Sequence, residues 1–129
     1  MGEALLAVHR SYFQLLWPLL ERDRIAAMAH ITGGGLVDNL PRVLGGCDAW
    51  IDRSSWKPPA LFRFLCESGH VGPEEAYQVF NMGIGMVLLV DTEHGPTLGT
   101  VAMPPTHRPS FRHLRRVIKK ADARELARE

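Results

Sequence analysis

The sequence predicts a single domain of the α/β or α+β class, in which helices pack on a β-sheet. Short apolar strand-like runs alternate with helical stretches over the first hundred or so residues, and such alternation is typical of these classes. With 129 residues, 46% of them hydrophobic and 22% charged, the chain is long enough for one real core. The formal net charge of +1 demands no nucleic acid or membrane partner.

The expected helices follow from apolar side chains at helical spacing and from proline and glycine at their ends. Pro18 is expected to kink or shorten the first helix, and Pro41 to interrupt the second. The expected helical ranges are residues 4–22, 36–44, 59–69 and 73–80.

The expected strands are short apolar or alternating runs over residues 25–31, 47–51, 86–90 and 98–103. The run Met86–Val90 is apolar throughout. Such a run indicates a strand that is buried on both faces.

The triplet Gly33-Gly34-Gly35 lies between an expected strand and an expected helix. Adjacent glycines weaken regular structure, and in return they allow positive φ angles and close approach of backbone N–H groups to a ligand. A strand followed by glycines and a helix suits an anion such as phosphate at the helix N-terminus. A tight turn without a ligand explains the glycines equally well.

The residues beside the triplet add donors to this possible anion site. Thr32 to Gly35 could form a nest of backbone N–H groups. The amide of Asn39 could donate to a phosphate, and Arg42 could clamp it with two hydrogen bonds. Neither a Walker A loop nor a dinucleotide fingerprint matches the spacing.

A second glycine motif is Phe80-Asn81-Met82-Gly83-Ile84-Gly85-Met86. Its glycines precede a strand, whereas the dinucleotide motif places them after one, so they indicate a bulge or a close backbone approach. Asn81 either caps the preceding helix or faces a ligand, with the cap favoured.

Other polar residues have simpler interpretations. His9-Arg10-Ser11-Tyr12 reads as helix capping by Ser11 beside a solvated Arg10, and His30 as a packing histidine more often than a catalyst. No histidines stand at metal-ligand spacing, so no metal site is expected. Cys47 and Cys66 are expected to be free thiols in the cytoplasm. No apolar run approaches the length of a membrane span.

The chain changes character after residue 103. Prolines come first, and a run rich in arginine and lysine follows, with apolar residues at helical spacing. We expect a domain over residues 1–103 and a Pro-rich, then basic helical tail over 104–129. Nucleic-acid binding by the tail is disfavoured because no aromatic platform accompanies the charges.

These motifs resemble the C-terminal domain of phosphoribosylformylglycinamidine cyclo-ligase, also called aminoimidazole ribonucleotide synthetase. The resemblance covers about residues 3–91, in the family's order and approximate spacing. The residues that carry it are Leu5-Leu6, His9-Arg10-Ser11-Tyr12, Ala29 to Leu36, Asn39-Leu40-Pro41-Arg42, Phe62 to Leu65 with Gly69, and Phe80 to Met86.

The resemblance implies a three-layer α/β/α domain with a mixed sheet. It also implies an ATP-dependent enzyme of de novo purine synthesis that closes the imidazole ring of formylglycinamidine ribonucleotide. ATP and Mg²⁺ would bind mainly to an N-terminal domain outside this chain, and none is expected on this chain alone. The residues that would line the ribonucleotide side are His30, Thr32, Gly33, Gly34, Gly35, Asn39 and Arg42, with Asn81 and Gly83 nearby.

Some features depart from that family. Val8 stands where a proline is common. After Val90 the family has a helix and a further strand, but here only residues 91–97 precede Leu98-Gly99. A parallel crossover needs about a dozen residues, so we expect a hairpin and no crossover helix. The tail has no counterpart in the family.

Two functional classes remain open. One is a substrate-side domain that needs an ATP domain, or a full-length relative, for turnover. The other is a non-catalytic binding or regulatory module that kept the fold and forms oligomers.

Overall fold

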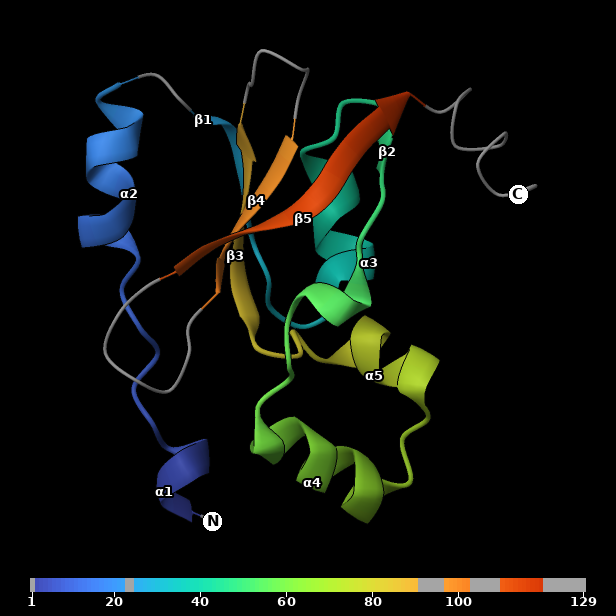
Figure 1. Cartoon of the computed structure of the whole chain (residues 1–129). Helices are drawn as coiled ribbons and strands as arrows, with labels where there is room; N and C mark the ends of the chain where they lie inside the picture. The colour runs from blue at the N-terminus through green and yellow to red at the C-terminus, as the bar shows by residue number, and fades with distance from the viewer. Residues whose placement is uncertain (1, 23–24, 91–96, 103–109, 120–129) are drawn as a thin grey trace.

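The computed structural model describes residues 2–22, 25–90, 97–102 and 110–119, the last two ranges as backbone (Figure 1). The helices are α1 (Gly2–Leu5), α2 (Phe13–Leu20), α3 (Gly35–Asn39), α4 (Ala60–Gly69) and α5 (Pro73–Val79), with 3-10 turns η1 (Leu40–Arg42) and η2 (Arg53–Ser55). The strands are β1 (Ile25–His30), β2 (Cys47–Ala49), β3 (Ile84–Val90), β4 (Thr97–Ala102) and β5 (Ser110–Lys119).

The strands form one sheet in the order β1-β3-β4-β5-β2. Every pairing among them is antiparallel, so the described sheet is not the mixed sheet that the family resemblance implied. β3 and β4 pair as a hairpin, with Val90 opposite Thr97. This confirms the expected hairpin pairing. Residues 91–96 themselves lie outside the described part.

Helices cover both faces of the sheet, which confirms the three-layer arrangement. Successive residues of a strand point to opposite faces, and Val87 and Leu88 on β3 show this directly. Val87 packs in the main core with Leu36 and Leu40 of the α3–η1 segment, while Leu88 packs against Leu16 of α2. In Figure 1, α2 and α3 lie on opposite sides of the strands.

The predicted helix over residues 4–22 was wrong in its middle. The chain is helical in α1 and again in α2, but not between them. His9 and Tyr12 in this stretch contact the ring of His30 at the end of β1. These long-range contacts explain why residues 6–12 run along the sheet instead of continuing a helix. The expected helix capping by Ser11 was wrong, because the N-cap of α2 is Tyr12 and no side chain caps this end; Ser11 only accepts a long hydrogen bond from the Phe13 N–H at 3.4 Å.

The predicted helix in the basic tail was also wrong for residues 110–119, which form β5. β5 pairs with β4 on one side and with β2 on the other. Without it, both neighbours would leave a row of backbone N–H and C=O groups unpaired, and these backbone bonds outweigh the helical spacing of the sequence. The expected boundary after residue 103 therefore cuts through the sheet. Residues 104–109 and 120–129 lie outside the described part.

Cys47 and Cys66 are free thiols, as expected. Within the ranges that the structure describes, none of the helices combines the length and apolarity required to cross a membrane.

Candidate functional site

The glycine loop starts where β1 ends beside β3. Ile31 is buried, and its N–H donates to the carbonyl oxygen of Gly85 at 2.9 Å. The Gly35 N–H then donates to the Thr32 carbonyl oxygen at 3.1 Å and closes a turn. Gly34 and Gly35 have φ angles of 92° and 56°, in the left-handed region that favours glycine. The strand-turn-helix layout predicted from the sequence is present.

Close packing explains Gly35. A Cβ atom at this position would collide with the carbonyl oxygen of Tyr77, and it would lie 2.8 Å from that of Phe80. The start of α3 therefore rests directly on the end of α5. Gly33 differs, because a Cβ there would meet open space. Thr32 and Gly33 are exposed and form the face of the loop that a ligand can reach.

Asn39 stabilises the glycine loop through hydrogen bonds from the protein interior. Its side chain is buried, with 4% of its surface exposed. Its Nδ2 donates to the carbonyl oxygens of Gly35 at 2.7 Å and Gly33 at 3.2 Å. Both amide hydrogens are thus directed at the loop, which gives Asn39 a structural task where the sequence suggested a phosphate donor.

Arg42 is not brought to the loop. It is exposed and ends η1, at the far end of the helical segment that Gly35 begins. The rise of about 1.5 Å per helical residue puts the two backbones about 10 Å apart. Arg42 and the glycines thus lie at opposite ends of the α3–η1 segment.

The second glycine motif forms a turn between α5 and β3. The Asn81 side-chain oxygen accepts from the Gly83 N–H at 3.0 Å, so Asn81 stabilises this turn, while Phe80 is the cap of α5. Gly83 has a φ of 91° and packs against the ring of Pro59. The Trp56 indole N–H donates to the Met82 carbonyl at 3.1 Å. Asn81 and Gly83, which were predicted to lie near the ligand, thus have a structural role in this turn.

A cluster of His9, Tyr12 and His30 lies beside the glycine loop. The Nε2 atoms of His9 and His30 are 3.0 Å apart. The Tyr12 ring packs edge-on to both imidazoles, with centroid distances of 5.7 Å to His9 and 6.2 Å to His30. Its hydroxyl reaches Gly85, where a Cβ would collide with it. Sequence reasoning gave the capping role in this motif to Ser11 and assigned no site role to His9 or Tyr12; only the resemblance motif that contains them pointed to this region.

The side chain of Tyr12 is partly buried. Burial raises the pKa of its phenol above the ordinary value of 10.0, and the nearby positive charge of Arg10 opposes this shift. The phenol is therefore neutral at physiological pH and keeps its proton for hydrogen bonding.

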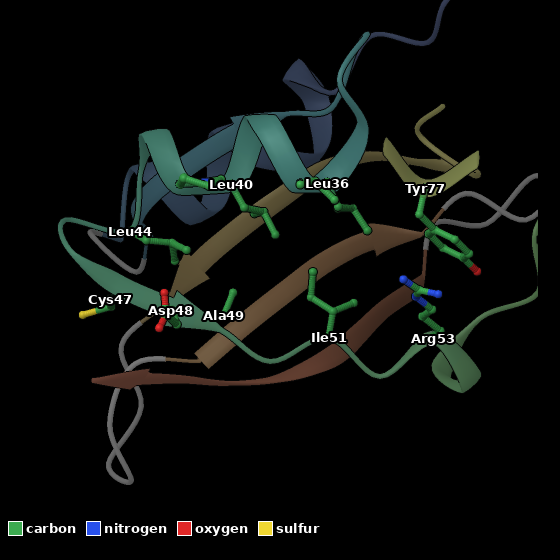
Figure 2. A pocket seen from close by; sticks show the side chains of 11 residues that line it. Leu36, Leu40, Leu44, Cys47, Asp48, Ala49, Ile51, Arg53 and Tyr77 are labelled. Atoms are coloured by element: carbon green, nitrogen blue, oxygen red, sulfur yellow. The ribbon is translucent and has the colours of Figure 1, made fainter. Parts of the chain in front are cut away.

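A groove of about 430 Å³ lies on the other side of α3 (Figure 2). Leu36 of α3 and Leu40 of η1 point into it, and Ile51 faces them from the opposite wall. At one end Arg53 forms a two-pronged ion pair with Glu74, at 2.7 and 2.8 Å, and lies 4.3 Å above the Tyr77 ring. None of the predicted site residues lines this groove, so it is separate from the glycine loop.

The donor set does not suit Mg²⁺-ATP. Magnesium prefers several carboxylate and phosphate oxygens, whereas the described residues around the loop present a single carboxylate, that of Asp38 against Gly34, beside imidazoles, a hydroxyl and backbone groups. Within the described ranges, no three His, Cys, Asp or Glu side chains gather to hold a metal ion. No step of this chain is therefore assigned to Mg²⁺ or ATP.

Comparison with known proteins places these features in a family. The family described as AIR synthase related protein, C-terminal domain, matches residues 1–99. Both glycine motifs and the His9–Tyr12–His30 cluster lie inside the matched range. The chain belongs to this family.

Curated relatives are named phosphoribosylformylglycinamidine cyclo-ligase. The protein of Desulfitobacterium hafniense (strain DSM 10664 / DCB-2) is 48% identical over 94 residues, which cover 72% of this chain and 28% of the relative. That of Bacillus subtilis (strain 168) is 45% identical over 95 residues, covering 73% and 28%. That of Geobacillus kaustophilus (strain HTA426) is 50% identical over 94 residues, covering 72% and 27%. The chain thus corresponds to little more than a quarter of these relatives.

Proposed function

We propose that this chain is the substrate-side domain of a cyclo-ligase that closes the imidazole ring of formylglycinamidine ribonucleotide in purine biosynthesis. Family membership over residues 1–99 carries the proposal. ATP would activate the amide oxygen of the substrate on a separate N-terminal domain, which the relatives' greater length accommodates. This chain would bind and orient the ribonucleotide and would transfer no proton.

The exposed face of the glycine loop is the proposed contact for the ribonucleotide phosphate. Thr32 and Gly33 offer a hydroxyl and backbone N–H groups, and His30 lies next to them at the end of β1. Gly34, Gly35 and Asn39 shape the loop from within, and the turn of Asn81 and Gly83 supports the neighbouring strand. Arg42 belongs to this site only if the substrate extends along α3.

Calorimetric titration with formylglycinamidine ribonucleotide tests the half-site. We expect saturable binding, weakened at least fivefold by Thr32→Val and by His30→Gln. Arg42→Ala should have a smaller effect, because its side chain begins about 10 Å from the glycines. His70→Asn is the matched control, since His70 is an exposed residue at the end of α4. No binding by the unmutated chain near millimolar ligand would refute the half-site.

Turnover by the chain alone is not expected. The purified protein, incubated with ATP and the ribonucleotide, should form no aminoimidazole ribonucleotide. Formation of this product by protein free of host enzyme would show that the chain does not need a separate ATP domain.

A non-catalytic binding module is the second candidate, and the outer face of α2 favours it. Phe13, Trp17 and Leu20 are 63%, 48% and 41% exposed, and the rings of Phe13 and Trp17 contact each other at a tilt of 31°, with centroids 5.3 Å apart. Exposed apolar patches of this kind mark interaction surfaces. Light scattering at increasing concentration should then show oligomers that Trp17→Lys reduces. A strict monomer at all concentrations would count against this candidate.

A further inference from the structure

The His9–His30 pair has a geometry that neither a packing role nor phosphate recognition requires. The two imidazoles come from segments far apart in the chain, His9 from the stretch before α2 and His30 from the end of β1. Their Nε2 atoms lie 3.0 Å apart, at hydrogen-bond distance, and both side chains are exposed to solvent.

The distance between the two Nε2 atoms is typical of two histidine nitrogens that bind the same metal ion. Metal–imidazole bonds are about 2.0–2.1 Å long. Two such bonds at a right angle place the nitrogens about 2.9 Å apart, and at a tetrahedral angle about 3.3 Å apart. The observed 3.0 Å falls within this range. An ion held by both nitrogens would replace the hydrogen bond at nearly the same nitrogen separation. It would lie to one side of the line between the nitrogens, so both rings would tilt toward it.

The surroundings hold both rings in place. Tyr12 packs edge-on against both imidazoles, and its hydroxyl is lodged against Gly85 of β3. Because these contacts bring the two rings together before the ion arrives, binding costs less conformational entropy than it would for two separate side chains. Solvent can occupy the remaining coordination positions. The charge of Arg10, which acts on Tyr12, opposes a cation and limits the affinity.

We propose that His9 and His30 form a two-histidine binding site for a late first-row divalent ion, Cu²⁺, Ni²⁺ or Zn²⁺. Imidazole nitrogen selects these ions over Mg²⁺ and Ca²⁺, and Cu²⁺ binds most tightly in the Irving–Williams order. In the bound state each ring carries its proton on Nδ1 and offers the Nε2 lone pair. The ring that donates the Nε2–H hydrogen bond in the free protein shifts its proton to Nδ1, so binding between neutral rings releases no proton. The site does not depend on the proposed function.

Titration of the metal-free full chain tests this site. We expect one Cu²⁺ per chain at this site, with an electron paramagnetic resonance spectrum showing two imidazole nitrogens, and weaker Ni²⁺ and Zn²⁺ binding by calorimetry.

The variants His9→Gln and His30→Gln should each weaken Cu²⁺ binding at least tenfold, and the double variant should weaken it little further. His70→Asn, which changes an exposed histidine outside the pair, should leave it unchanged. Nitrogen NMR of the unmutated protein with Zn²⁺ should shift the Nε2 signals of both His9 and His30, a readout independent of variant folding. A loss below tenfold in either variant, or Nε2 signals that Zn²⁺ leaves in place, would overturn the proposal.

Discussion

The buried amide of Asn39 is hydrogen-bonded to the carbonyl oxygen of Gly35 at 2.7 Å, and the same nitrogen reaches the carbonyl of Gly33 at 3.2 Å. One side chain thus holds both ends of the glycine triplet. The loop is shaped before any ligand arrives, and its rigidity derives from a residue that faces the protein interior.

Replacing Asn39 should therefore destabilise the fold. In Asn39→Ala the carbonyls of Gly33 and Gly35 lose their donor, and we expect a loss of about 1–3 kcal/mol in the free energy of unfolding by urea. Asn81→Ala is the comparison, because Asn81 is half-buried and accepts one hydrogen bond. It should cost about 1 kcal/mol or less. Equal losses in both variants would contradict the role given to Asn39.

Gly35 is expected to tolerate no side chain. Gly35→Ala adds a strained left-handed alanine and a collision with the carbonyls of Tyr77 and Phe80. We expect a cost of about 3 kcal/mol or more, measured by urea unfolding. Gly45→Ala is the matched control, since Gly45 has nearly the same φ of 58° but open space around it. It should cost about 1 kcal/mol, and a similar cost at both sites would show that backbone strain alone matters.

The ion pair between Arg53 and Glu74 should make stability depend on pH. The hydrogen bond and charge of Arg53 hold the pKa of Glu74 below its ordinary value of 4.5. A lowered folded-state pKa gives a contribution that is present above the unfolded pKa and lost as pH falls through the folded pKa. The melting temperature of the native chain should thus exceed that of Glu74→Gln at neutral pH, and the difference should vanish in acid.

Two controls isolate this ion pair. Glu75→Gln removes the neighbouring carboxylate in the same first turn of α5 and should not reproduce the acid-dependent difference. High salt should shrink the effect of Glu74→Gln, because both partners are exposed. A difference that persists unchanged in acid would refute the assignment to this carboxylate.

Tyr12 should contribute to stability up to alkaline pH. Burial raises its pKa above 10.0 in the folded protein. The contribution is fully present below the unfolded pKa and is lost as pH rises through the folded one. The melting temperature of the native chain should fall as the pH rises through the pKa of Tyr12. This fall should be smaller in Tyr12→Phe, which has no phenol to ionise at this position, and should be unchanged in Tyr77→Phe. Tyrosinate absorbance gives the titration directly, and a Tyr12 signal at or below pH 10 would contradict the predicted burial.

Local patterns in the sequence were enough to predict most elements near the site. Apolar runs and glycine or proline boundaries predicted β1, α3, α4, α5 and β3 close to where they lie. These elements are bounded by residues whose backbone preferences act locally, so no tertiary information was needed. The short connector after Val90 predicted the β3–β4 hairpin for a similar reason, because it cannot span a parallel crossover.

Tertiary contacts decided the rest. Residues 110–119 have helical spacing but form β5, because pairing with β4 and β2 satisfies backbone groups of all these strands. The contact of His9 with His30 interrupts the predicted first helix and creates a cluster that no spacing rule reveals. The sequence by itself determined the glycine loop and its place between strand and helix. Only the tertiary structure decided that Asn39 turns inward and that Arg42 lies far from the loop, because both depend on how α3 packs against α5 and the sheet.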